Sequence, residues 1–152
     1  MKILALLLAS AILLVCAGES HAVVRIANDR GGLIGRYVDR YDQLKDTGQT
    51  VVIDGLCASA CTIVLSIVPS NRICVTEKAN LAFHAAWDLG PDGRHITNPE
   101  ATRTMYLMYP APVRNWIATR GGLSPHTIFL RGARLKAIFP PCYLDAAVFL
   151  RS

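Results

Sequence analysis

The sequence predicts a single α/β domain whose core is a parallel sheet built from strand–helix–strand units. Residues 23–27 and 50–53 are short runs of strand length that are rich in β-branched residues. Between them, residues 33–45 carry apolar side chains every three or four positions, which is the spacing of an amphipathic helix. The pattern then continues, because residues 60–68 form a small apolar segment of helix length and residues 72–76 a further strand.

The N-terminus has the pattern of a cleaved signal peptide. Lys2 is followed by an apolar run over residues 3–16, and Ser20 and Ala22 supply small residues at alternate positions. An uncleaved anchor helix is the alternative, for which the run is short. We therefore expect a signal peptide at residues 1–22, one domain at residues 23–152, and a periplasmic or secreted protein.

The charged residues give no sign of a nucleic-acid-binding protein. The formal net charge is +5, but the arginines are scattered along the chain and form no basic tract. A modest, dispersed excess of this kind is typical of a soluble surface. We expect no nucleic-acid partner.

Four cysteines lie beyond the expected signal peptide, namely Cys57, Cys61, Cys74 and Cys142. In an oxidising compartment they predict two disulfides, with three possible pairings. We favour Cys61 with Cys74 and Cys57 with Cys142, because this pairing would tie the segment after residue 59 to the next strand and pin the C-terminus. Reactive free thiols are the alternative. No CxxC pair or Cys/His cluster supports zinc, so we expect no metal.

The rest of the chain predicts short elements. Asn98, Pro99 and Glu100 have the pattern of a helix start, and prolines at 110 and 112 should break that helix near Tyr109. The other expected elements are a strand at 81–83, a loop at 88–93, a second helical piece to residue 120, an extended piece at 127–130 and a helix at 133–139.

Three groups with catalytic potential follow predicted strands. Gly31 and Gly32 follow the first strand, Ser59 follows the second, and His84 follows the strand at 81–83. The carboxyl ends of parallel strands meet at one edge of a sheet, where ligands bind. Glycine N–H groups could there hold an oxyanion while the serine attacks and the histidine takes its proton. Taken singly, such a serine is usually a small packing residue and such a histidine an ordinary surface or core residue.

These segments resemble the Clp-type serine peptidases of the ClpP/crotonase superfamily. Residues 26–32, IANDRGG, are similar to that family's strand ending in Asn-Ser-Pro-Gly-Gly, and residues 57–61, CASAC, resemble its Ala-Ala-Ser-Met-Gly nucleophile turn. His84 falls where the family has its catalytic histidine. The resemblance runs over residues 23–140 and is nearest to small secreted Clp-like proteins with a CASACT motif.

The resemblance implies a repeated βαβ spiral core, N-terminally short, and a role for each site residue. Ser59 would be the nucleophile, His84 the base, and the N–H groups of Gly32 and Ala60 the oxyanion hole. The family's triad aspartate does not carry over, because Thr127 stands at its position. Two loop residues are candidates for a replacement third member, Asp88 and Asp92. A truncated start and a pared-down domain would each explain the short N-terminal part.

The leading functional expectation is a secreted serine hydrolase or peptidase that acts on peptide or other acyl substrates without a cofactor. The alternative is a catalytically inactive Clp-like binding or scaffold protein of the periplasm, which the absent aspartate favours. A crotonase-like thioester enzyme is disfavoured because the periplasm lacks coenzyme A. The family also suggests a homo-oligomer, whereas no ATP-driven chaperone partner is expected.

Overall fold

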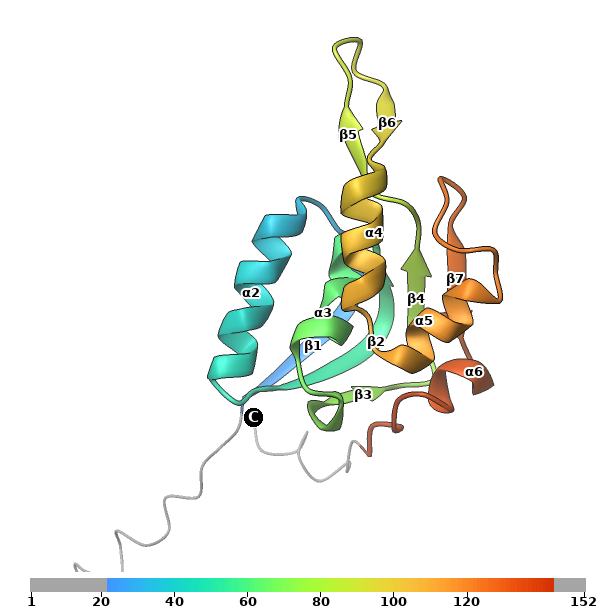
Figure 1. Ribbon diagram of the computed structural model, residues 1–152. Helices are drawn as coiled ribbons and strands as arrows, with labels where there is room; N and C mark the ends of the chain where they lie inside the picture. The colour runs from blue at the N-terminus through green and yellow to red at the C-terminus, as the bar shows by residue number, and fades with distance from the viewer. Residues whose placement is uncertain (1–21, 144–152) are drawn as a thin grey trace, which may run out of the picture.

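The computed structural model describes residues 22–143 (Figure 1). The expected signal peptide lies outside these residues apart from Ala22, as does the end of the expected 23–152 domain. None of the described helices is long and apolar enough to cross a membrane. The elements are β1 (Val23–Asp29), α2 (Ile34–Asp46), β2 (Thr50–Ala58), the 3₁₀ helix η1 (Ser59–Ile63), α3 (Val64–Ile67), η2 (Ser70–Arg72), β3 (Ile73–Val75), β4 (Asn80–Phe83), β5 (Trp87–Leu89), β6 (His95–Thr97), α4 (Pro99–Met108), α5 (Ala111–Ala118), β7 (Ile128–Arg131) and α6 (Ala133–Lys136).

Strand β2 is the centre of a five-stranded sheet. β1 pairs with β2 in parallel along one edge. The other edge is shared, because β3 pairs in parallel with the first half of β2 and β4 pairs in parallel with the second half. β7 then runs antiparallel to β4. The predicted α/β class, with a parallel core and a β1–α2–β2 unit, is confirmed.

The sequence of β2 explains its central place. Val51, Val52 and Ile53 are all buried, so both faces of the strand are covered, as is usual for a strand inside a parallel sheet. Helix α2 packs on the sheet through its apolar stripe, in which Tyr41 and Leu44 are buried. The expected amphipathic helix is therefore confirmed.

Helices α4 and α5 begin and end at the residues that the sequence marks. The Asn98 side chain caps α4 by accepting a hydrogen bond of 2.9 Å from the Ala101 N–H, and Pro99 is the first helical residue. The predicted break near Tyr109 is confirmed, because α4 ends at Met108 and α5 begins at Ala111. The Tyr109 ring packs edge-on against Phe83, with ring centroids 5.3 Å apart, and so joins the two helices to β4.

The segment after Ser59 differs from the expected helix at 60–68. It consists of the 3₁₀ helix η1 followed by one α-helical turn, α3. Tight 3₁₀ turns are frequent at helix N-termini. Here the first turn also closes a disulfide ring between Cys57 and Cys61, which keeps the segment compact. The expected helix at 133–139 is likewise shorter, since α6 ends at Lys136.

The expected loop at 88–93 is instead part of a β-hairpin. β5 and β6 pair antiparallel, and the hairpin projects from the body of the molecule beyond α4 (Figure 1). Its turn is closed by a hydrogen bond of 2.9 Å from the Gly93 N–H to the Gly90 carbonyl. Trp87 stacks on His95 across the strands. Each strand of the hairpin has three residues, all of them exposed, and so short a pattern does not identify a strand from the sequence.

Candidate active site

Ser59 lies at a strained turn between β2 and η1. β2 ends at Ala58, and Ser59 has a φ of 55°, the one positive φ at a non-glycine residue among residues 22–143. A left-handed conformation at such a residue costs about 1–3 kcal/mol and persists only where its surroundings enforce it. Turns of this kind at the end of a sheet strand carry the exposed nucleophile of many serine hydrolases.

The loop after β1 packs directly on this turn. Gly31 has a φ of 81°, and a Cβ atom placed on it would lie 2.6 Å from the Ala58 oxygen, 2.7 Å from the Ser59 Cβ and 2.8 Å from the Ala60 nitrogen. Only glycine fits so close to another backbone. The structure thus brings Gly31 together with the serine turn.

Asp29 fixes the shape of this glycine loop. One of its carboxylate oxygens accepts hydrogen bonds from the Gly31 N–H, at 2.9 Å, and from the Tyr37 hydroxyl. Burial, together with the neighbouring carboxylate, raises the pKa of Tyr37 to about 12, so its hydroxyl stays a donor at neutral pH. In the described part of the chain no protein acceptor takes the Gly32 N–H.

His84 follows β4 at the same edge. In the parallel pairing of β2 with β4, Ala58 lies opposite Ala82, so Ser59 and His84 both emerge just beyond the paired residues. The half-buried imidazole makes a hydrogen bond of 2.7 Å between Nδ1 and the Ala85 carbonyl oxygen. A carbonyl oxygen can only accept, so in this bond Nδ1 carries the proton. The neutral ring then has its lone pair on Nε2, which is the form a general base needs.

Thr127 lies where a third catalytic member would be expected. β4 and β7 pair antiparallel, with Phe83 opposite Ile128, so Thr127 comes next to His84. The two residues line the same cavity of about 300 Å³, together with Trp87, His95 and others. The cavity holds no carboxylate, and the contact that orients the imidazole is the backbone oxygen of Ala85.

The two aspartates considered as substitutes lie in the hairpin. Asp88 accepts a hydrogen bond of 2.8 Å from the Asn98 side chain, and Asp92 forms an ion pair of 3.0 Å with Arg94. Within residues 22–143 neither carboxylate forms a hydrogen bond with His84. The structure therefore does not bring either one to the imidazole.

The cysteines do not pair as expected from the sequence, so the predicted pairing of Cys61 with Cys74 and of Cys57 with Cys142 is wrong. Cys57 is bonded to Cys61, with Cα atoms 5.3 Å apart, and Cys74 to Cys142. Cys74 pairs in the sheet with Val52, near the opposite end of β2 from the Ser59 turn, so it cannot reach Cys61. The chain after α6 returns beside β3, where the Cys142 N–H donates to the Val75 oxygen.

A buried chain of hydroxyl groups supports the Ser59 turn, and sequence reasoning missed it. The Thr62 hydroxyl donates to the Ser59 carbonyl oxygen at 2.6 Å and also lies 2.6 Å from the Tyr109 hydroxyl. Because the Thr62 proton is already used, Tyr109 must be the donor in the second bond. Burial raises the pKa of Tyr109 to about 12, which keeps that donor protonated.

Tyr41 adds a third contact to the same turn. Its buried hydroxyl donates to the Cys61 carbonyl oxygen at 3.0 Å, and burial raises the pKa of Tyr41. The turn between Cys57 and Thr62 is therefore held by a disulfide and by hydroxyl groups from α2 and from the α4–α5 joint. The spacing of Thr62, three residues after Ser59, was the one local signal of this support in the sequence.

Comparison with known proteins gives limited information. No protein-family model matches the chain, and no curated protein sequence matches it. Among solved structures, the chain is similar to a mutant form of ClpP1 from Listeria monocytogenes, with 17% sequence identity and a TM-score of 0.46. The match covers 83% of this chain and 75% of that one. At this identity the likeness says nothing about catalysis by Ser59 and His84.

Proposed function

We propose that this protein is a serine hydrolase that cleaves peptide or other acyl substrates, with Ser59 as nucleophile and His84 as general base. The observation that carries the proposal is the strained Ser59 turn, packed against Gly31 and supported from three sides. A serine that serves only as a small packing residue needs no left-handed backbone. Strain that is so heavily supported is characteristic of functional sites.

The proposed reaction uses two side chains, Ser59 and His84, and two backbone N–H groups. The Ser59 Oγ attacks the substrate carbonyl carbon, and its proton passes to Nε2 of His84. The carbonyl oxygen becomes an oxyanion, which the N–H groups of Gly32 and Ala60 would hold. As the tetrahedral intermediate collapses, the bond to the leaving group breaks and His84 returns the proton to the leaving oxygen or nitrogen. Water then hydrolyses the acyl-enzyme by the same route.

Ala85 takes part of the role that an aspartate has in a complete triad. Its carbonyl oxygen fixes the Nδ1–H tautomer of His84 but carries no full negative charge to stabilise the imidazolium. Loss of the tautomer-fixing carboxylate costs about four orders of magnitude in a complete triad. We therefore expect a slow enzyme whose serine still reacts with strong electrophiles.

One observation favours a second candidate, a binding or scaffold protein without turnover. Thr127 rather than a carboxylate lies beside His84, and Ser59 forms no hydrogen bond with His84 within residues 22–143. In that case the supported turn would persist as a structural joint. The two candidates differ in whether Ser59 reacts.

Reaction with a fluorophosphonate probe separates them. The oxidised protein should be labelled, and the Ser59→Ala variant should lose all labelling. The His84→Ala variant should label at least tenfold more slowly, because the base is absent. Ser70→Ala is the matched control, since Ser70 is an exposed serine in η2, and it should label like the parent protein. If the folded, oxidised protein takes up no probe, the hydrolase proposal fails and the binding or scaffold role is the one supported.

The site of action is part of the proposal. We place the mature protein outside the cytoplasm, after cleavage near residue 22; the two disulfides and the N-terminal sequence pattern support this. N-terminal sequencing of protein recovered from the exported fraction should begin near Val23. Full-length protein retained inside the cell would oppose it. Assembly into a homo-oligomer stays a prediction, which sedimentation analysis can check.

A further inference from the structure

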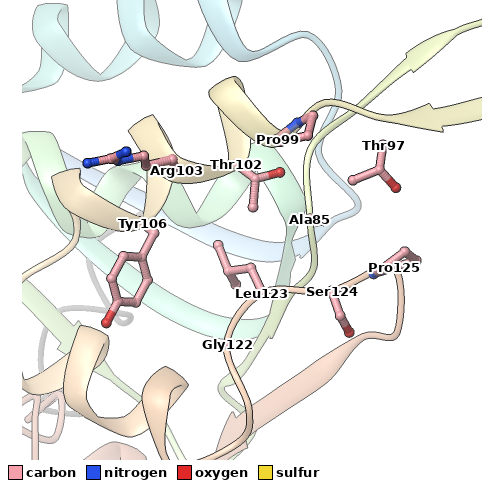
Figure 2. A pocket seen from close by; sticks show the side chains of 10 residues that line it. All are labelled: Ala85, Thr97, Pro99, Thr102, Arg103, Tyr106, Gly122, Leu123, Ser124 and Pro125. Atoms are coloured by element: carbon pink, nitrogen blue, oxygen red, sulfur yellow. The ribbon is translucent and has the colours of Figure 1, made fainter.

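An apolar cleft lies next to the candidate site. Its volume is about 480 Å³, and it opens between the first turns of α4 and the segment 122–125 (Figure 2). Figure 2 shows Leu123 in the middle of the lining, with the Tyr106 ring on one side and Pro99 and Thr97 on the other. The volume lies in the range of pockets that hold small organic ligands.

This cleft adjoins the cavity that contains His84. Both hollows are lined by Ala85, Thr97 and Pro125, so they meet along the chain that leaves β4. Ser59 lines neither of them. The cleft therefore adjoins the cavity of the imidazole and is not formed by the serine itself.

The hydroxyl groups of Thr102 and Ser124 in the cleft are hydrogen-bonded within the protein, whereas Thr97 and Arg103 line it without a side-chain partner among residues 22–143. Figure 2 shows the Arg103 guanidinium directed away from Leu123, so this residue faces the cleft with its aliphatic stem. The Thr102 hydroxyl donates to the Asn98 carbonyl oxygen at 2.6 Å and accepts from the Ala86 N–H at 2.9 Å. The Ser124 hydroxyl accepts from the His126 N–H at 3.2 Å. The Tyr106 hydroxyl points toward α5, 3.4 Å from a carbonyl oxygen, so its ring faces the cleft.

We propose that this cleft binds an uncharged, apolar leaving group of the substrate. The inference rests on the proposed hydrolase function and adds the class of substrate. The proton taken from Ser59 must be returned by His84 to the leaving atom, so the leaving group has to lie beside the imidazole. The hollow on that side is lined mainly by apolar atoms, with the Thr102 and Ser124 hydroxyl groups engaged and the Arg103 guanidinium directed away from Leu123, which suits an aliphatic or aromatic alcohol or amine.

Acetate esters of unbranched alcohols test the proposal, because the acyl group stays small and the alcohols are of nearly equal acidity. The kcat/KM should rise with alcohol length from propyl to octyl acetate, by roughly three- to fourfold for each methylene group that becomes buried. A matched series, ethyl esters of acids from acetic to octanoic, should show a weaker dependence on length.

Variants in the lining assign the effect to this cleft. Tyr106→Ala removes an apolar wall and should reduce the octyl-to-propyl ratio of kcat/KM at least fivefold. Tyr106→Phe keeps the ring and should keep the ratio. Thr97→Trp, at the exposed rim, should also reduce the ratio by filling the cleft, which covers the case that Tyr106→Ala does not fold. Leu107→Ala is the control, because Leu107 is an exposed apolar residue of α4 outside the lining.

Binding of 1-octanol, followed by amide chemical shifts, gives a readout that needs no turnover. Chemical-shift changes centred on residues 97–106 and 122–125, and reduced in Tyr106→Ala, support binding in the cleft. They do so even if no ester is cleaved and Ser59 takes up no probe. Those two negative results would count against the hydrolase function alone. Two results overturn the inference while the hydrolase proposal remains supported. The first is labelling of Ser59 by the probe without any chemical-shift change on addition of octanol. The second is a dependence on alcohol length that is unchanged in both Tyr106→Ala and Thr97→Trp.

Discussion

Gly31 lies so close to Ser59 that a Cβ atom on the glycine would come within 2.7 Å of the serine Cβ. Gly31 belongs to the loop after β1, and Ser59 belongs to the turn after β2. The contact therefore joins the segments that follow two neighbouring strands of the sheet. The contact holds the loop that carries Gly32 against the serine turn. Any side chain at residue 31 must displace one of the two loops.

Gly31→Ala should therefore abolish probe labelling of Ser59 and lower the free energy of unfolding by about 1–3 kcal/mol, since the residue has a positive φ and no room. Gly35→Ala is the matched control. Gly35 lies in α2 with nothing within 4 Å of its would-be Cβ, so alanine should stabilise the helix by roughly 0.5–1 kcal/mol. Denaturant unfolding and labelling rates measure both. Normal labelling of Gly31→Ala would show that the contact does not shape the site.

Thr62→Val removes the hydroxyl that supports the Ser59 carbonyl oxygen. The labelling rate should fall roughly tenfold, equivalent to about 1.4 kcal/mol, which is within the range for a buried hydrogen bond. Thr62→Ser retains the hydroxyl and should restore most of the rate. Thr104→Val, an exposed position on α4, is the control. The labelling rates are compared at a temperature at which every variant is fully folded. Under that condition a loss of stability alone would leave the labelling rate unchanged.

The two disulfides should differ in what they contribute. Replacing Cys74 and Cys142 by alanine opens a loop of 68 residues and should lower the free energy of unfolding by roughly 4 kcal/mol. Replacing Cys57 and Cys61, four residues apart, should cost only about 2 kcal/mol by the same chain-entropy estimate, yet slow the labelling of Ser59 far more. Equal effects of the two replacements on labelling would contradict a bracing role for the shorter bridge.

Thr127→Asp would place a carboxylate beside His84, in the cavity that the two residues share. If the missing negative charge limits catalysis, turnover of an activated ester should rise at least tenfold. Thr127→Asn has a side chain of similar size without the charge and should give little gain. An equal response to both substitutions would mean that charge at this position does not limit the rate.

Asp54 makes stability depend on pH. Hydrogen bonds from Thr76 and Arg25 lower the pKa of this buried carboxyl. A carboxyl with a depressed folded-state pKa stabilises the fold above its unfolded pKa of about 3.9, and this contribution is lost as pH falls toward the folded value. The free energy of unfolding should decline below about pH 4, and Asp54→Asn should flatten the decline. An identical acid profile in both proteins would exclude Asp54 as a source.

The sequence was informative for several features whose cause is local. The β-branched run at 50–53, the cap at Asn98 and the glycine pair each act within a few residues, so the strand, helix start and loop could be predicted. Other features depend on contacts between distant segments. The Thr62–Tyr109 hydrogen bond spans 47 residues, and the disulfide pairing follows from the return of the C-terminal segment beside β3. No local pattern contains that information.

The nucleophilic role of Ser59 is tested most directly by peptide mapping of the oxidised protein after reaction with a fluorophosphonate. One adduct per chain is expected, on the peptide that carries Ser59, with unmodified peptides for Ser66, Ser70 and Ser124. An adduct on another serine, or no adduct on folded protein, would contradict that role.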